Sequence, residues 1–219
     1  MEFWQSIVMT GIDHLIEVAK IAEEVGFAGV TVADHLVTPN RVLIGIGIGI
    51  GWMEEEFELV GRPFQERGRR TEELMQVARK LFSGERVEHH GEFYDFDPVQ
   101  LAPVPKNHPP VLIGGHSPKA LRRAAAADGW LGVNYDLEKV PPILAALRED
   151  RCELGREHAP FHVALALNDL SELEELHRLE EAGLSMIINP PAMSTSGEQT
   201  SLDEKREQLE SYAKRFIVH

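Results

Sequence analysis

The sequence has almost no cysteine and no long apolar run, and both shortages exclude whole classes of protein. Among 219 residues there is a single cysteine, Cys152, so the chain cannot form an internal disulfide. We therefore predict a reducing, cytoplasmic location. No apolar run approaches the roughly 18 residues of a membrane-spanning helix, and we expect no membrane partner. The start, Met1 to Trp4, also lacks the basic and apolar regions of a signal peptide.

Basic residues are also in short supply. The chain carries 22 Lys and Arg against 36 Asp and Glu, a formal net charge of −14. Without a basic stripe to neutralise phosphates, we expect no nucleic-acid partner. We also expect no metal site, because the adjacent pair His89 and His90 lacks the spacing with which two histidines converge on one ion.

Short apolar runs and amphipathic segments alternate along most of the chain. The runs that predict strands cover 3–9, 29–33, 41–51, 111–113, 130–133, 161–167 and 185–188. Segments with helical spacing of apolar residues separate most of them. This alternation predicts an α/β fold with a parallel sheet and right-handed crossovers.

The pattern is about one strand-and-helix unit short of a closed (β/α)8 TIM barrel. Seven strands are predicted where eight are needed. Between Thr38 and Arg41 two predicted strands meet without the dozen or more residues that parallel neighbours need. Either one unit is missing between Asn40 and Arg41, which is what we expect, or these two strands are not parallel neighbours. Residues 1–219 are predicted to form a single barrel domain, with an excursion at 85–110 that packs over the site.

The stretch from Val111 to Gly129 organises the rest of the chain. A predicted strand at 111–113 runs into Gly114 and Gly115, which allow a sharp turn. Ser117 suits the N-cap of the following helix, and Pro118 suits its first position. Backbone amides and the helix dipole at such a turn can bind a phosphate or another anion. An ordinary strand-to-helix turn has the same sequence preferences, so both interpretations stay open.

Ligands of α/β proteins bind at the carboxyl ends of the strands, which gives further candidates. These are Asp34, His35, Gly47 to Trp52, Gly114 to Ser117, Asn134, Asn168 and Asn189. The alternating glycines at 45–51 do not fit the dinucleotide fingerprint. They allow a flat ring to lie against the backbone, or they belong to a tightly packed strand. His35 is either a general acid or base, or a structural histidine.

Taken together, four segments resemble the luciferase-like monooxygenase family, and within it the deazaflavin (coenzyme F-420) dependent oxidoreductases. The segments are Val30–Leu36, Val42–Phe57, Pro110–Ala125 and Asp128–Trp130. Two departures stand out. The strand that family members place between the Asp-His strand and the glycine strand is missing, and the glycine run is one Ile-Gly longer than usual.

The resemblance implies a (β/α)8 barrel with a flavin or deazaflavin at its C-terminal mouth and a small organic substrate. Because strands beside a missing unit would have unpaired edges, we also expect a homodimer. The resemblance implies that Gly114, Gly115 and Ser117 hold the phosphate of the cofactor, that His116 also contacts the cofactor, and that Gly47, Gly49 and Trp52 line the pocket. Asp34 and His35 would be the catalytic residues near the ring. The expected activity is hydride transfer between coenzyme F-420 and the substrate. The alternatives are an FMN-dependent monooxygenase and a non-catalytic flavin-binding degenerate barrel.

Overall fold

A computed structural model of the protein describes residues 1–7, 10, 12–31, 46–48, 51, 53–170, 172–189 and 200–217. The chain divides into two compact units, Met1–Gly47 with Val111–His219, and Ile48–Pro110. The excursion predicted at 85–110 lies within the second unit. The single-domain organisation and the packing of the excursion over the site stay predictions.

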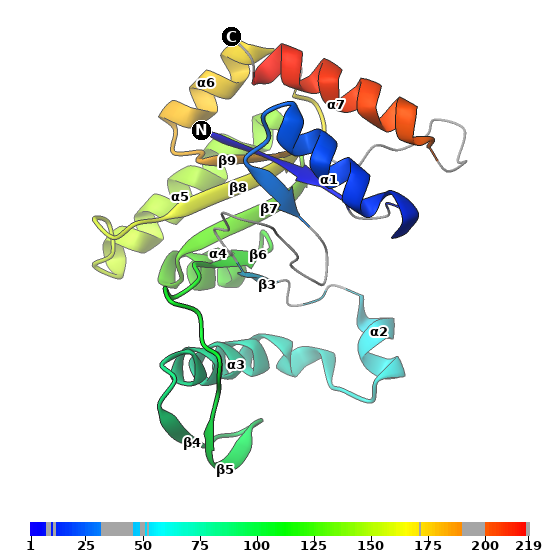
Figure 1. Ribbon diagram of the computed structural model, residues 1–219. Helices are drawn as coiled ribbons and strands as arrows, with labels where there is room; N and C mark the ends of the chain where they lie inside the picture. Colours follow the sequence, from blue (N-terminus) through cyan, green and yellow to red (C-terminus); the bar gives the residue numbers. More distant parts are fainter. Residues whose placement is uncertain are drawn as a thin grey trace. The chain divides into compact units, whose positions relative to one another are not determined.

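The first unit is built on a parallel sheet (Figure 1). In the described residues the sheet has seven strands, in the order β2-β1-β9-β8-β7-β6-β3. The bounds are β1 Glu2–Ser6, β2 Gly29–Thr31, β3 Ile46–Ile48, β6 Val111–Gly114, β7 Gly129–Tyr135, β8 His162–Leu167 and β9 Met186–Asn189. Each of the seven predicted runs overlaps one of these strands, which confirms the sequence pattern. The pairings from β2 through to β6 are all parallel.

Helices follow the strands as the crossovers of a parallel sheet require. They are α1 Leu15–Glu24, α4 Pro118–Ala126, α5 Val140–Glu153, α6 Leu173–Glu181 and α7 Leu202–Phe216. α1 and α7 lie against each other (Figure 1). No helix in the described part of the chain is both long and apolar enough to cross a membrane.

Alternate residues of the strands pack on opposite faces of the sheet. On one face, Phe3 packs against the cluster that α1 and α7 form around Ile21. On the other face, Trp4 packs with Leu112 and Ile188. The sheet therefore has one face toward the helices and one face away from them.

The architecture is that of a truncated TIM barrel, as the sequence predicts. Within the described residues β2 and β3 stand at the two ends of the strand order. The seam at Asn40 and Arg41 lies outside the described residues, so the missing unit between them stays a prediction.

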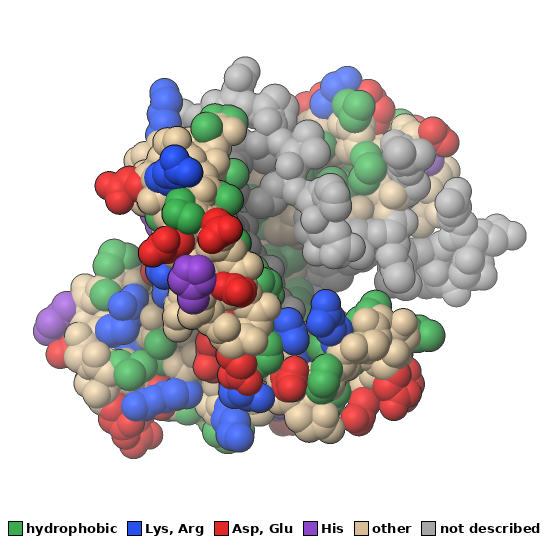
Figure 2. Space-filling view, turned by 90° about the horizontal axis from the view of Figure 1, so that it is seen from below, with side chains coloured by type: hydrophobic (Ala, Val, Ile, Leu, Met, Phe, Trp, Pro, Cys, Tyr) green, Lys and Arg blue, Asp and Glu red, His purple; other side chains and the backbone are tan. Residues whose placement is uncertain are grey.

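The second unit contains α2 Glu54–Leu59, α3 Arg67–Phe82, and the antiparallel pair β4 Arg86–His90 and β5 Asp95–Gln100. The sequence analysis predicts an excursion at 85–110 but not the hairpin within it. On the face seen in Figure 2, acidic and basic side chains are interspersed over the described surface.

Candidate functional site

The turn between β6 and α4 has the conformation that its sequence predicts. Gly115 has a φ of +105°, and a Cβ atom placed there would lie 3.0 Å from Cβ of Ala120. Ser117 is extended, and its Oγ accepts a hydrogen bond of 3.2 Å from the amide of Ala120. Gly115, His116 and Ser117 are exposed. The nine-residue helix α4 therefore begins at an accessible turn at the carboxyl end of β6, where its dipole favours an anion.

Trp130 on β7 fixes this turn from the neighbouring strand. Its indole Nε1 donates a 2.8 Å hydrogen bond to the carbonyl oxygen of Gly115. The side chain is fully buried, and Ile113 is its register partner on β6. Gly132 leaves room for the ring, because a Cβ at that position would lie 2.8 Å from it. The indole thus sets the position of the turn without occupying its exposed side.

The structure brings two predicted glycine features onto neighbouring strands. Gly47 lies in β3, and β3 is next to β6, which ends at Gly114. The other predicted members of the site, Asp34, His35, Gly49 and Trp52, lie outside the described residues, so their positions and roles stay predictions.

The end of β7 differs from the sequence-based prediction. The strand was expected to stop at Val133, but it continues to Tyr135 across a register shift. Asn134 is the inserted residue, with a φ of 61°. The ring of Tyr135 meets the Trp130 and His116 rings edge to face, at centroid distances of 5.4 Å and 6.4 Å. Burial raises the pKa of the Tyr135 phenol.

Sequence reasoning missed Tyr135 and the hydrogen bond of Trp130. The available signal was Asn134 itself, because asparagine adopts positive φ far more readily than most residues. An asparagine that directly follows an apolar strand is therefore compatible with a bulge and with continuation of the strand. That signal does not specify which aromatic residues the bulge brings together.

Asn168 and Asn189 come together at a cavity of ≈ 640 Å³ between the strand ends and α7. Asn189 Nδ2 donates a 2.7 Å hydrogen bond to Oε1 of the buried Gln5, which also lines this cavity. Asn168 Nδ2 donates to Oδ1 of Asp136 at 3.0 Å. The sequence analysis predicted both asparagines as site residues but not Gln5, which lies within a strand and not after its end.

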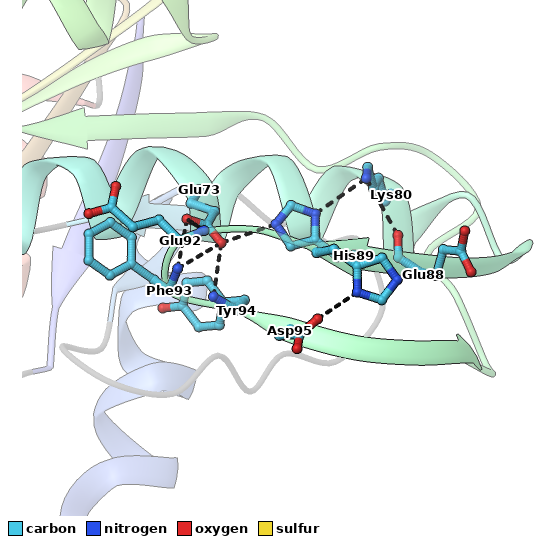
Figure 3. Close-up of polar contacts among 9 residues, drawn as sticks. Glu73, Lys80, Glu88, His89, Glu92, Phe93, Tyr94 and Asp95 are labelled. Carbon is cyan, nitrogen blue, oxygen red and sulfur yellow. Dashed lines mark hydrogen bonds and ion pairs between the residues drawn. The ribbon is translucent and has the colours of Figure 1, made fainter.

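The paired histidines take part in separate contacts in the second unit (Figure 3). His89 lies between Glu73 and Lys80, whereas His90 contacts Asp95. Arg122 on α4 pairs with two carboxylates of α5, Asp150 and Glu153. These side chains have protein partners, which agrees with structural roles.

Comparison with known proteins identifies the family. A model of the family described as luciferase-like monooxygenase matches residues 36–216. The chain belongs to this family.

Curated relatives are longer than this chain. The uncharacterized protein Rv0940c of Mycobacterium tuberculosis is 36% identical over 181 residues, which cover 82% of this chain and 62% of that protein. An FMNH(2)-dependent dimethylsulfone monooxygenase of Pseudomonas fluorescens is 29% identical over 161 residues, covering 71% of this chain and 43% of that one. The chain thus spans about three fifths or less of the length of these relatives.

Solved structures share the fold at low identity. The monooxygenase RslO1 from Streptomyces bottropensis superposes with a TM-score of 0.75 at 16% identity, covering 99% of both chains. A secondary alcohol dehydrogenase dependent on coenzyme F-420 gives a TM-score of 0.70 at 16% identity, covering 95% of this chain and 98% of that one. The luciferase-like fold extends over nearly the whole chain.

Proposed function

We propose that the chain is an oxidoreductase that transfers hydride between coenzyme F-420 and a small organic substrate. The observation that carries the proposal is the turn at Gly114–Ser117. It is accessible, and it places the backbone amides of the N-terminus of α4 at the carboxyl end of β6. Membership of the family supports it, as does the fold shared with an alcohol dehydrogenase that depends on the same coenzyme.

The turn fits the phosphate end of such a cofactor. A side chain at position 115 would meet Ala120, so the backbone itself forms the wall of the turn. We propose that Gly114, Gly115 and Ser117 hold the phosphate and that His116 borders it. When bound, the deazaflavin supplies the hydride chemistry. The residues of the turn bind and orient it, and Trp130 keeps the turn in place.

We propose that His35, with Asp34 beside it, acts at the reacting end. A hydrogen bond formed mainly in the transition state lowers turnover when it is lost, with little effect on affinity. His35→Ala should therefore reduce kcat far more than it weakens cofactor binding. Unchanged turnover at saturating cofactor would assign His35 a structural role.

Titration of the purified protein with F-420 and with FMN, followed by fluorescence quenching, tests the choice of cofactor. Tighter binding of F-420 is expected. The FMN-dependent monooxygenase is the second candidate, and the 29% identical FMNH(2)-dependent relative favours it. Equal or reversed affinities would overturn the deazaflavin assignment. Cofactor binding without turnover of any alcohol or aldehyde would favour a non-catalytic flavin-binding protein.

The chain offers a matched pair of variants for the phosphate site. Ser117 and Ser201 each accept a hydrogen bond from an amide in the first turn of their helix, at 3.2 Å and 3.3 Å, and the Ser201 hydroxyl also donates to Glu204. Each Ser→Ala change should cost about 1 kcal/mol of stability. We expect only Ser117→Ala to weaken FMN or F-420 binding beyond this shared loss. An equal effect of the two variants on cofactor binding would show that the turn is not part of the cofactor site.

We also propose that the protein forms a homodimer. Sheet ends that lack a neighbouring strand favour pairing with another chain. Sedimentation equilibrium should give twice the monomer mass of 24.5 kDa, and a monomer at micromolar concentration would contradict the proposal.

A further inference from the structure

Asn134 stands out because a strained backbone and an exposed side chain occur together. Its φ of 61° lies in the left-handed region, and it is the extra residue of the bulge between Val133 and Tyr135. The residue is exposed, and no other residue in the described part of the chain hydrogen-bonds to its amide side chain. Bulges next to active sites re-aim side chains, and strained residues cluster at such sites.

The bulge is held on both sides. On one side the Tyr135 ring packs against Trp130, whose indole holds the carbonyl of Gly115. On the other side the carbonyl oxygen of Tyr135 accepts a 2.9 Å hydrogen bond from the backbone amide of Asn168, which directly follows β8. Asn134 is therefore a fixed feature of the same sheet edge as the Gly114–Ser117 turn.

The register places Asn134 beyond the turn. Gly114 pairs with Leu131, and Asn134 lies three residues further along β7, roughly 10 Å toward the carboxyl end. A ligand whose phosphate sits at the turn and which extends across this edge presents its next segment to Asn134. In FMN and in F-420 the group that links the phosphate to the ring is a chain of hydroxyl groups. A carboxamide both donates and accepts hydrogen bonds, as binding to hydroxyls requires.

We propose that Asn134 is a cofactor-positioning residue that binds the polyhydroxyl chain between the phosphate and the ring. This inference rests on the proposed function, because it takes the phosphate to lie at the turn. The opposing explanation is purely conformational, since asparagine tolerates positive φ better than most residues. Glycine separates the two explanations because it keeps the backbone conformation and removes the amide.

The test compares wild type with Asn134→Gly for three probes: FMN, riboflavin, which lacks the phosphate, and lumiflavin, which lacks the hydroxyl chain as well. Asn134→Gly should weaken FMN and riboflavin by a similar factor, about three- to tenfold for one or two neutral hydrogen bonds, and leave lumiflavin unchanged. Asn134→Ala should give the same pattern and should also lower the melting temperature, because alanine is strained at φ 61°.

Three outcomes would overturn the inference. Asn134→Gly could bind all three probes like wild type, which would make Asn134 a conformational residue only. It could weaken lumiflavin as much as FMN, which would place Asn134 at the ring. Wild type could bind neither FMN nor riboflavin. Whether wild type binds F-420 more tightly than FMN tests the proposed function separately. The ratio of the variant's affinity to the wild-type affinity for one probe does not depend on that preference.

Discussion

The carboxylate of Glu73 on α3 faces the ring of His89 on β4, with 3.1 Å between Oε1 and Nε2. The same carboxylate accepts hydrogen bonds from the backbone amides of Phe93 and Tyr94, which lie in the turn of the hairpin (Figure 3). A Cβ atom at Gly91 would lie 2.0 Å from Glu73 Oε1, so only glycine fits beneath the carboxylate. One side chain of α3 thus holds the tip of the β4–β5 hairpin.

We predict that Glu73→Gln loosens the hairpin tip. The amide has one acceptor oxygen instead of two, and its NH2 group would face backbone donors. Hydrogen exchange of the amides of Phe93 and Tyr94 should become roughly tenfold faster. Glu85→Gln is the matched control, because Glu85 lies in the same unit and is exposed. Equal exchange rates in the two variants would show that the carboxylate does not hold the tip.

The tip should also loosen in acid. Burial acts to raise the pKa of Glu73, but the hydrogen bonds from Tyr94, Phe93 and His89 outweigh it and hold the pKa below its ordinary value of 4.5. A depressed pKa stabilises the folded state above the unfolded value, and this contribution is lost as pH falls through the folded pKa. Exchange protection of Tyr94 should therefore be constant from pH 7 to about 5 and fall below about 4.5. The Glu73→Gln variant should not show this step, and the same step in that variant would assign it to other groups.

We predict that Gly115→Ala destabilises the fold more than Gly155→Ala. Both glycines have positive φ, +105° and +64°. Alanine at position 155 meets no atom within 4 Å, whereas at position 115 its Cβ would meet Ala120 at 3.0 Å. We expect a loss of about 1 kcal/mol for Gly155→Ala and about 2–3 kcal/mol for Gly115→Ala in urea unfolding. Equal losses would mean that the turn relaxes freely.

Arg151→Met should be strongly destabilising. The buried guanidinium of Arg151 donates to the carbonyl oxygens of Arg156 and Ala159 and lies 4.2 Å from the centroid of the Phe161 ring. Burial lowers the pKa of Arg151, but an arginine side chain in a protein stays protonated at neutral pH. Methionine keeps the apolar stem but leaves the carbonyl of Ala159 without the arginine donor, and the carbonyl of Arg156 with only the backbone amide of Ala159 as its donor. We expect a loss of about 2–3 kcal/mol in urea unfolding.

The control for Arg151 is Arg148→Met on the same helix. Arg148 is exposed, although it donates to the carbonyl oxygen of Ala182. Its loss should stay below about 1 kcal/mol. Similar unfolding midpoints for the two variants would show that the contacts of Arg151 add no stability beyond those of a surface arginine.

Local sequence rules were sufficient to predict the structure of a segment where one interaction between nearby residues dominates. Ser117 and Pro118 identify the first turn of α4 because capping and proline geometry act within a few residues. Short apolar runs identify the seven strands that the described residues form, because a strand buried on both faces of a sheet needs apolar residues along its length. The contacts around the turn were not predictable in this way. The indole of Trp130 reaches Gly115, fifteen positions away, through the pairing of β6 with β7.

The hairpin was missed for a related reason. Its strands carry charged and polar residues with little alternation, such as Glu88, His89 and His90 in β4. Much of its order comes from Glu73 on another element, which no local pattern reveals. Tyr135 was missed because the bulge at Asn134 extends β7 by two residues beyond its last apolar position.

The pairing of β1 with β9 has a consequence for the synthesis of the chain. Trp4 pairs with Gly29 on one side, but its partner on the other side is Ile188. At translation rates of about 5–20 residues per second, the N-terminal strand is exposed on that side for on the order of ten seconds or more before β9 emerges. Such distant pairings slow folding. Until β9 is synthesised, the nascent chain therefore exposes an unpaired edge of β1. We expect a chaperone to bind the chain during this time.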